Sequence, residues 1–246
     1  MALTALTLED PTLPAAAIIA VLESGRLFPP GASLVAGRIP DVATVVYPEE
    51  EVSLASASAK RRREFSAGRT VARRAIRALG IEVEAIPARA DRSPVWPDGI
   101  TASISHSGDI CAAVAARKGV LLSIGLDVEI TEPSGRGLAR YIAGEEELCR
   151  ASGALGEDGL ALRVLFSAKE AFFKAWHPLF GTWLDFHDVR VGLGQGAQNG
   201  TDASALSFDA PNMSTVRPLN FQGRWQLVER AVLVGVTCSL SGSDTG

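Results

Sequence analysis

The chain has 246 residues, of which 47% are hydrophobic, so it can bury a sizeable core and is expected to be globular. Its formal net charge of −4 argues against a general binder of polyanions, although a local basic patch remains compatible with it. Cys111, Cys149 and Cys238 are far apart and form no CxxC pair, which argues against a disulfide framework or a zinc ribbon and favours a reducing cytoplasm.

The first expected element is a helix over residues 13–22, LPAAAIIAVL, ending near Gly25. The apolar run is too short to cross a bilayer. Glu9 and Asp10 precede it, where a signal peptide would carry basic residues. The sequence therefore gives no signal for secretion or membrane insertion.

Residues 58–79 form the most basic segment of the chain. Phe65, Ala72 and Ile76 recur at helical spacing, and Gly80 is suited to end the helix. Its other faces carry Lys60, Arg61, Arg62, Arg63, Arg69, Arg73, Arg74 and Arg77 against the single acid Glu64. This pattern indicates an anionic ligand, with a solvated helix face as the alternative for each arginine.

A series of short strands is expected next. Residues 93–99 read as an extended, proline-interrupted segment, and residues 100–107 and 110–117 as two strands joined by a tight turn. Residues 120–130 alternate apolar and small or acidic side chains with a period of two, which predicts a strand over all eleven residues.

Helices and strands follow again in the second half. We expect helices over residues 138–150 and 160–176, the second ended by Pro178. Residues 192–215 read as an exposed loop or hairpin, and residues 223–240 as strand. Because both halves mix the two element types, the sequence predicts an α+β protein with two lobes, residues 1–119 and 120–246.

Asp127 and Glu129 are the first candidates for chemistry. Since they are two residues apart in a predicted strand, both side chains leave the same face, with Cα atoms roughly 6.5–7 Å apart, and can converge on one small cation such as Mg²⁺. Gly125 on that face is costly in a strand unless another group approaches closely. The alternative is an ordinary solvent-facing pair of acids.

The helix that follows carries Glu170 and Lys174 on a face separate from its apolar stripe, at positions i and i+4. A simple intrahelical salt bridge would explain this pair alone. The coincidence of two strand carboxylates, an acid–base pair, a basic helix and His106 in one chain instead indicates a site for a Mg²⁺–pyrophosphate ligand.

Six stretches occur together in the order and at the distances of a known family: LFP (27–29), RRREFSAGR (61–69), SPVWPDG (93–99), SISHS (103–107), GLDVE (125–129) and LFSAKEAFFKAWHPLFGTWLDF (165–186). On these motifs the chain closely resembles the Sfp-type 4′-phosphopantetheinyl transferases, specifically the enterobactin-synthase component D subgroup. The resemblance covers roughly residues 27–190.

The resemblance implies a fold and a reaction. The fold is two similar α+β lobes related by a pseudo-twofold, with coenzyme A in the cleft between them. The reaction moves the 4′-phosphopantetheine moiety of coenzyme A to a serine of an apo acyl or peptidyl carrier protein and releases adenosine 3′,5′-bisphosphate. The implied cofactor is Mg²⁺, with Mn²⁺ possible, and the implied protein is a cytoplasmic monomer serving siderophore, polyketide, non-ribosomal peptide or fatty-acid carriers.

The resemblance also implies roles for individual residues. Asp127, Glu129 and Glu170 would bind the metal. Glu170, directly or through a metal-bound water, would be the base for the carrier serine, and Lys174 would stabilise the departing phosphate or deliver its proton.

Further positions match those that bind the coenzyme A phosphates in the family, namely Arg61, Arg69, Ser105 and His106. The chain departs from the family at Ala88, where relatives carry a basic residue, so Arg89 and Arg92 are candidates to replace it. No role for Lys169 follows from the sequence.

Two other functions use the same residues. A Mg²⁺-dependent phosphohydrolase would consume coenzyme A or nucleotides without a protein acceptor. A nucleic-acid-binding protein would use the basic helix and would not need Asp127 or Glu170. Neither nucleic acid nor membrane is expected as a partner.

Overall fold

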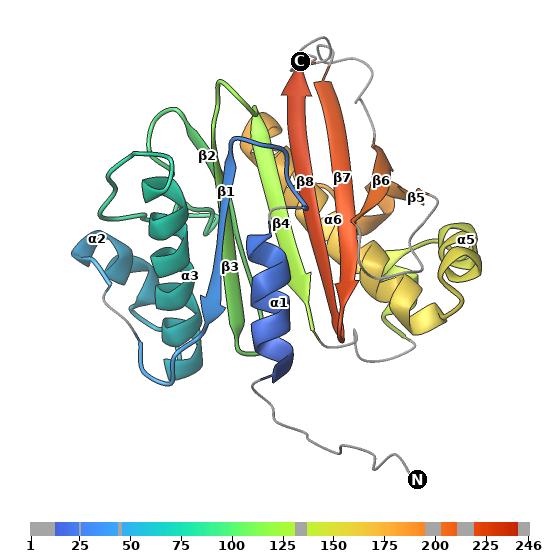
Figure 1. The fold of residues 1–246 in the computed structure, drawn as a ribbon, viewed down its shortest axis with the longest axis horizontal. Coiled ribbons are helices and arrows are strands. Elements are labelled where there is room, and N and C mark those ends of the chain that lie inside the picture. The colour runs from blue at the N-terminus through green and yellow to red at the C-terminus, as the bar shows by residue number, and fades with distance from the viewer. Residues whose placement is uncertain are drawn as a thin grey trace, which may run out of the picture.

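The computed structural model describes residues 13–24, 26–43, 46–130, 137–194, 203–210 and 219–240. Two antiparallel sheets and the helices packed on them make up this part of the chain, so the protein has the predicted α+β fold with two lobes (Figure 1). The predicted boundary at residue 119 falls between the last strand of the first sheet and the first strand of the second.

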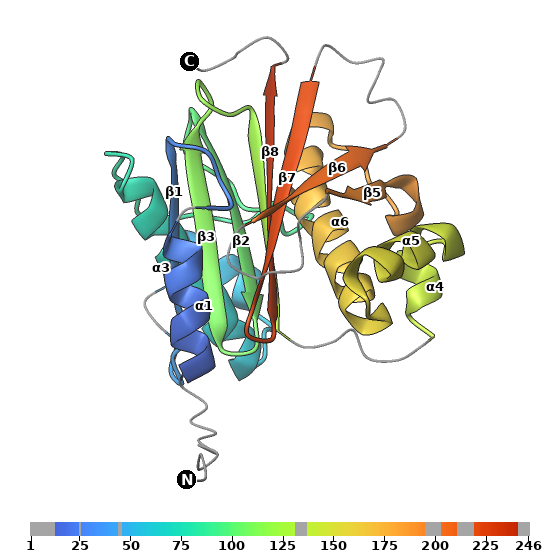
Figure 2. The same ribbon diagram turned by 45° about the vertical axis from the view of Figure 1, so that its right-hand side comes forward.

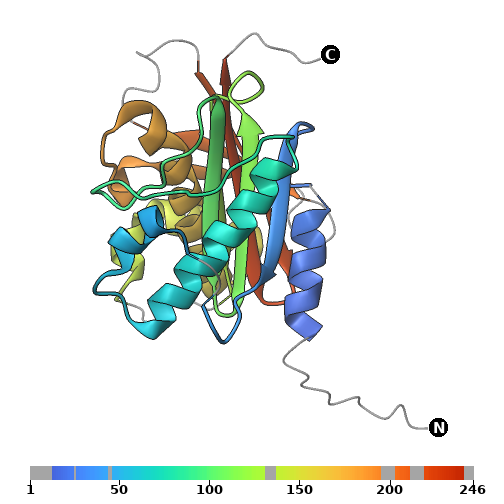
Figure 3. The same cartoon turned by 90° about the vertical axis from the view of Figure 1, so that its left-hand side faces the viewer.

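The first lobe is built on a three-stranded sheet of order β1-β3-β2. Its elements are α1 (Leu13–Glu23), β1 (Ala32–Arg38), α2 (Pro48–Glu51), η1 (Val52–Leu54), α3 (Ala59–Arg77), β2 (Ile100–Ser107) and β3 (Ile110–Arg117). Helix α3 covers one face of this sheet (Figure 3). It begins after Ser58, whose hydroxyl accepts a hydrogen bond from the Arg61 amide and so caps the helix.

The second lobe is built on a five-stranded sheet of order β4-β8-β7-β6-β5. Its elements are β4 (Ser123–Glu129), α4 (Ala139–Ile142), α5 (Glu145–Leu155), α6 (Asp158–Phe180), η2 (Phe186–Asp188), β5 (Arg190–Leu193), β6 (Ser204–Asp209), β7 (Leu219–Val228) and β8 (Ala231–Leu240). Helix α6 packs on one face of this sheet, with α5 beside it, while α1 lies toward the opposite face (Figure 2).

One hydrophobic core joins the two lobes. It contains buried residues of α1 and β3 together with every second residue of β4, namely Ile124, Leu126 and Val128. The intervening β4 residues face α6 instead, as the period of two predicts. Because both sheets contribute to this one core, the two lobes pack directly against each other.

The seam between the sheets runs along β2 and β4 and is made by serine hydroxyls. Ser103, Ser105 and Ser107 of β2 accept hydrogen bonds from the backbone amides of Leu126, Val128 and Ile130, at 3.0, 3.2 and 3.1 Å. Buried amides at the edge of β4 thereby find acceptors without a backbone ladder. This seam fixes the position of β4 relative to β2.

The elements expected near the N-terminus, over the basic segment and at residues 100–107 and 110–117 are confirmed. The eleven-residue strand is wrong in length, because only Ser123–Glu129 is strand. The amides of Val120 and Leu121 both donate to the Arg117 carbonyl, so the chain is still turning there. Leu121 consequently joins the shared core, which breaks the alternation predicted from residue 120.

Two further expectations need correction. The helix predicted over residues 138–150 is two helices, α4 and α5, because Ala143 and Gly144 are extended. Helix α6 continues through Pro178 to Phe180 and ends at Gly181, whose φ of 63° suits glycine. Proline in the last turn costs only the hydrogen bond to the Lys174 carbonyl. The hairpin expected within residues 192–215 is confirmed where the structure describes it, because β5 and β6 pair as antiparallel strands. Residues 195–202 and 211–218 lie outside the described residues, as do 131–136 of the loop expected before α4. No helix in the described part of the chain is long and apolar enough to cross a membrane.

Candidate active site at the seam of the two lobes

Helix α6 lies unusually close to β4, and Gly125 permits it. A Cβ atom built at Gly125 would overlap the Ala171 carbonyl oxygen and would lie 3.0 Å from the Ala175 amide nitrogen. No side chain therefore fits between strand and helix at this point, which confirms that a close approach requires the glycine. The contact brings the charged face of α6 next to the acids of β4.

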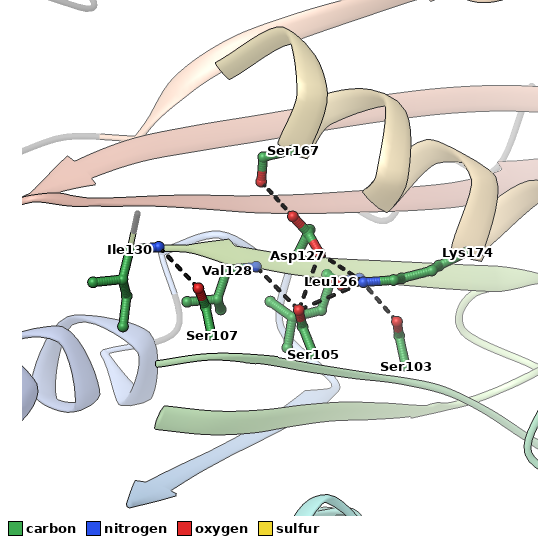
Figure 4. A network of polar contacts seen from close by, with 9 residues as sticks. All are labelled: Ser103, Ser105, Ser107, Leu126, Asp127, Val128, Ile130, Ser167 and Lys174. Atoms are coloured by element: carbon green, nitrogen blue, oxygen red, sulfur yellow. Dashed lines mark hydrogen bonds and ion pairs between the residues drawn. The ribbon is translucent and has the colours of Figure 1, made fainter. Parts of the chain in front are cut away.

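Asp127 stands at the centre of a polar network that connects three elements (Figure 4). Its Oδ1 accepts hydrogen bonds from Ser105 Oγ of β2 at 3.0 Å and from Lys174 Nζ of α6 at 2.6 Å. Its Oδ2 accepts one from Ser167 Oγ, also of α6, at 2.8 Å. Asp127 is buried, so this network compensates for the loss of water around its charge.

Lys174 contacts Asp127 and not its helical neighbour Glu170. Besides the ion pair with Asp127, its ammonium donates to the Leu126 carbonyl at 3.2 Å and lies 3.5 Å from Ser105 Oγ. No intrahelical Glu170–Lys174 salt bridge forms within the described residues. Lys174 is thus the counter-ion of a carboxylate from another element.

Glu129 and Glu170 lie beside this network, and both carboxyls have raised pKa values. Burial is the main cause for each; for Glu129, Asp127 is the next largest cause and the pKa reaches about 7. For Glu170, Lys174 opposes the increase in pKa and Asp127 adds to it. The carboxyls of Glu129 and Glu170 therefore each feel the negative charge of Asp127.

These three carboxylates are the residues that fit a divalent cation. The described residues contain no His, Cys, Asp or Glu cluster already arranged as metal ligands. The donor chemistry nevertheless suits Mg²⁺, which prefers oxygen ligands, and a cation would relieve the repulsion that raises the pKa values of Glu129 and Glu170.

His106 of β2 lies between this acidic site and the basic helix. Burial lowers the pKa of its imidazole, Glu64 of α3 opposes that effect, and Arg61 and Lys174 strengthen it. The ring thus feels charges from α3 on the one hand and from α6 on the other. Glu64 is an additional residue of this neighbourhood to which the sequence assigned no role.

A groove in the first lobe gathers the predicted phosphate-binding arginines. Arg61, Arg89 and Arg92 line it together, with a volume of about 660 Å³. Phe65 and the serines Ser53, Ser56 and Ser58 also contribute to its walls. Three exposed guanidinium groups around one groove make it suitable for an anionic ligand.

The loop that carries two of these arginines is a short, well-bonded turn. The Arg89 amide donates to the Ser93 carbonyl, and the Arg92 amide donates to the Arg89 carbonyl. Arg92 has a φ of 68°, the left-handed region that is uncommon for a non-glycine residue. The turn holds Arg89 and Arg92 at one end of the groove.

Arg69 does not line this groove. Its guanidinium is buried over the Phe65 ring at 4.4 Å, and Nε donates to the Ile86 carbonyl at 2.7 Å. Burial lowers its pKa to about 10. These contacts tie α3 to the segment before the Arg89 turn, and the predicted contact of Arg69 with coenzyme A remains a prediction.

Other arginines of α3 are also engaged by the protein itself. Arg62 pairs with Glu51, Arg73 with the buried Glu50, and Arg77 donates to the Val83 carbonyl. The solvated face expected as the alternative is wrong for Arg73, which is buried, whereas Arg62 and Arg77 keep partly exposed side chains. All three arginines are engaged within the protein, so less of the helix is available to bind nucleic acid.

The structure assigns a role to Lys169, for which no role follows from the sequence. Its buried ammonium donates to the Ile142 and Phe186 carbonyls, each at 2.9 Å, and to Glu147 Oε2 at 2.7 Å. Lys169 thus fastens α4, α5 and η2 to α6 and has no part in the charged site.

A second cavity, of about 450 Å³, lies between α5 and the strands β5 and β6. None of the predicted site residues lines it. Apart from Arg69, the residues predicted from the sequence lie at the seam or in the arginine groove of the first lobe.

Comparison with protein families identifies the fold as that of the phosphopantetheinyl transferases. Residues 49–116 match the 4′-phosphopantetheinyl transferase N-terminal domain, and residues 123–212 match the 4′-phosphopantetheinyl transferase superfamily. The chain belongs to this superfamily, which confirms the predicted family, fold class and enzyme class.

Individual relatives point to the same family. The chain is 33% identical over 198 residues to the 4′-phosphopantetheinyl transferase Svp of Streptomyces mobaraensis, covering 80% of each protein. It is 34% identical over 199 residues to Npt of Nocardia iowensis, covering 77% of this chain and 88% of the relative. It is 38% identical over 126 residues to enterobactin synthase component D of Salmonella typhimurium, covering 50% of this chain and 51% of the relative.

Proposed function

We propose that this chain transfers the 4′-phosphopantetheine moiety of coenzyme A to a serine hydroxyl of an apo acyl or peptidyl carrier protein, in a Mg²⁺-dependent reaction in the cytoplasm, acting as a monomer. Mn²⁺ is an alternative metal. Carriers of siderophore, polyketide or non-ribosomal peptide biosynthesis are the candidate acceptors. The observation that carries the proposal is the Asp127–Lys174 ion pair at the seam, with the carboxyls of Glu129 and Glu170 electrostatically coupled to Asp127, in a chain of this superfamily.

Asp127, Glu129 and Glu170 would hold the cation together with the pyrophosphate of coenzyme A. When bound, the cation neutralises negative charge on the phosphoryl group under attack. The clustered carboxylates support this assignment, because their mutual repulsion is relieved by a positive charge.

The chemical step moves one proton and exchanges one P–O bond. The carrier serine oxygen forms a bond to the phosphorus that bears pantetheine, and the bond from this phosphorus to the bridging oxygen breaks. Glu170, half-buried on the open face of α6, is the proposed acceptor of the serine proton. Lys174 is close enough to the acids to balance charge on the departing adenosine 3′,5′-bisphosphate.

The groove formed by Arg61, Arg89 and Arg92 is the proposed binding site for the nucleotide phosphates. Ser105, which donates to Asp127, and His106, whose pKa responds to charges of both α3 and α6, are proposed to contact the same ligand. Arg89 and Arg92 would supply the basic group that is absent at Ala88. Arg69 would act on coenzyme A by fixing α3 beside the groove.

The proposed carrier-binding surface consists of the aromatic side chains that lie next to Glu170 on α6 and on the segment after it. Phe166 and Phe173 lie on the same face of α6 as Glu170 because they are four residues before and three residues after it. Phe186 packs on Phe166 at 5.5 Å between ring centroids, and Trp183 packs on Phe173 at 4.9 Å. Since 78% of Trp183 is exposed, an acceptor that brings its serine to Glu170 can cover it.

Intact mass spectrometry of an apo carrier tests the reaction. The chain, coenzyme A and Mg²⁺ should add one phosphopantetheine group to the carrier, and EDTA should abolish the gain. Asp127→Asn and Glu170→Gln should lose the transfer, whereas Glu146→Gln, an exposed acid on α5, should keep it. Coenzyme A consumption without any carrier gain would instead establish the phosphohydrolase.

A separate measurement tests the docking surface. Trp183→Ser should raise KM for the carrier several-fold and leave KM for coenzyme A unchanged, because Trp183 lies outside the arginine groove. Val42→Ser, a change at another highly exposed apolar residue, serves as the control. An unchanged carrier KM in Trp183→Ser would move the docking surface elsewhere.

A further inference from the structure

Ser167 belongs to the Asp127 network but was not predicted from the sequence to have a function. Its side chain is fully buried on α6, and its hydroxyl donates to Asp127 Oδ2 at 2.8 Å. It comes from the helix that also supplies Glu170 and Lys174, and like Lys174 it points at β4 (Figure 4). A buried hydroxyl directed at a carboxylate fixes the orientation of that carboxylate.

The hydrogen bonds of Asp127 can be counted against its acceptor capacity. A carboxylate oxygen has two lone-pair sites. Oδ1 already accepts from Ser105 and Lys174, so both of its sites are in use. Oδ2 accepts only from Ser167 among the described residues, so one site on Oδ2 remains.

Ser105 and Ser167 approach the carboxylate from different lobes. Ser105 is itself fixed, because its oxygen accepts the Val128 amide while its hydroxyl donates to Oδ1. Ser167 is fixed by the close packing of α6 on Gly125. Rotation of the Asp127 carboxylate would therefore break a hydrogen bond to one serine or to the other.

We propose that Ser167 is a positioning residue which, opposite Ser105, sets the rotation of the Asp127 carboxylate so that Oδ2 keeps one acceptor site for the divalent cation. This inference rests on the proposed function, since it concerns the metal used in that reaction. It assigns Ser167 no contact with coenzyme A or with the carrier.

The test is Mn²⁺ binding followed by electron paramagnetic resonance of the free ion, with coenzyme A present and no carrier. Ser167→Ala should raise the Mn²⁺ dissociation constant about tenfold or more, as loss of a hydrogen bond that orients a metal ligand commonly does. Ser167→Thr keeps the hydroxyl and should restore binding to within a few-fold of the original chain.

Ser123→Ala is the matched control. Ser123 is a fully buried serine on β4, and its hydroxyl has no hydrogen-bond partner among the described residues. Its replacement should leave Mn²⁺ binding unchanged. Thermal unfolding of all three variants in EDTA separates a loss of metal binding from a loss of folded protein.

The outcomes separate this inference from the proposed function. If the original chain transfers phosphopantetheine but Ser167→Ala binds Mn²⁺ as tightly, the positioning role is wrong and the function stands. If Ser167→Thr binds Mn²⁺ as weakly as Ser167→Ala does, the packing of this side chain and not its hydroxyl determines Mn²⁺ binding, and the positioning role is again wrong. If the original chain modifies no carrier, the proposed function fails, and so does the inference built on it.

Discussion

At the residue scale, the chemistry of the site depends on how each charge is compensated. Lys174 compensates Asp127 through a direct ion pair, whereas Glu129 and Glu170 have no such partner within 4.0 Å among the described residues. Burial and neighbouring acids therefore raise the pKa values of these two groups. These two acids are thus electrostatically strained, and a bound cation would relieve that strain.

Replacement of Glu129 should reveal this strain. Its folded-state pKa, about 7, exceeds the ordinary value of 4.5, so its contribution to stability decreases as pH rises between these two values. Glu129→Gln should therefore stabilise the metal-free protein by about 1–2 kcal/mol at pH 8 and by little at pH 4.5. Thermal unfolding in EDTA at the two pH values measures the effect.

The control for this change is Glu146→Gln, whose exposed carboxylate should give no such difference between the two pH values. Adding Mg²⁺ should stabilise the original chain more than Glu129→Gln. Equal stabilisation of both would show that Glu129 does not interact with the metal.

The groove arginines belong to the same scale. Arg61 is exposed and lines the groove, whereas Arg69 is buried against Phe65. Arg61→Ala should raise KM for coenzyme A about tenfold by removing a charged hydrogen bond worth ~1.5–3 kcal/mol, and should change kcat by less than about twofold. Arg74→Ala, on the same helix but outside the groove, is the control. An unchanged KM in Arg61→Ala would exclude the groove as the phosphate site.

At the element scale, the distance between α6 and β4 decides whether the site exists. Gly125 lets the helix backbone rest on the strand, and the serine seam fixes the strand to β2. Lys169 then holds α4, α5 and η2 against α6. These contacts hold β4 and α6 together. Asp127 and Glu129 therefore meet the face of α6 that carries Glu170 and Lys174.

Gly125→Ala tests this contact. The added methyl group would overlap the Ala171 carbonyl, which is part of a helix backbone and cannot move away alone. We expect a loss of about 3 kcal/mol or more in the free energy of unfolding, measured by chemical denaturation. Gly119→Ala is the matched control, since no atom lies within 4 Å of the position of its added methyl group. Equal stability of the two variants would contradict the packing described above.

At the scale of the whole molecule, the two lobes share one core and should unfold together. Helix α1 contributes Leu22, which is completely buried in the core formed by β3, β4 and β8. Leu22→Ala should therefore lower the stability of both lobes by about 2–5 kcal/mol in one transition. Tryptophan fluorescence and far-ultraviolet circular dichroism should report the same denaturant midpoint, because Trp96 lies in the first lobe and Trp225 in the second.

Leu79→Ala is a suitable comparison, because the Leu79 side chain is only partly buried at the border of the first-lobe core. Its loss should lower the free energy of unfolding by less than the loss of Leu22 does. Two separate transitions in Leu22→Ala, one for each lobe, would show that the shared core does not couple them.

The sequence by itself determined the features that depend on local periodicity and local chemistry. The period of two placed Asp127 and Glu129 on one face, and the helical period separated the apolar stripe of α6 from Glu170 and Lys174. Gly125 signalled a close approach, because a strand interior tolerates glycine poorly otherwise. The ordered motifs identified the family.

Only the tertiary structure decided which distant residues meet. Lys174 could pair with Glu170 on its own helix, and its contact with Asp127 depends on how α6 packs on β4. Ser167 gained a role for the same reason, and Arg69 turned out to be buried while Arg61 lines the groove. These contacts join residues far apart in the chain, and local propensity carries no information about the packing that brings them together.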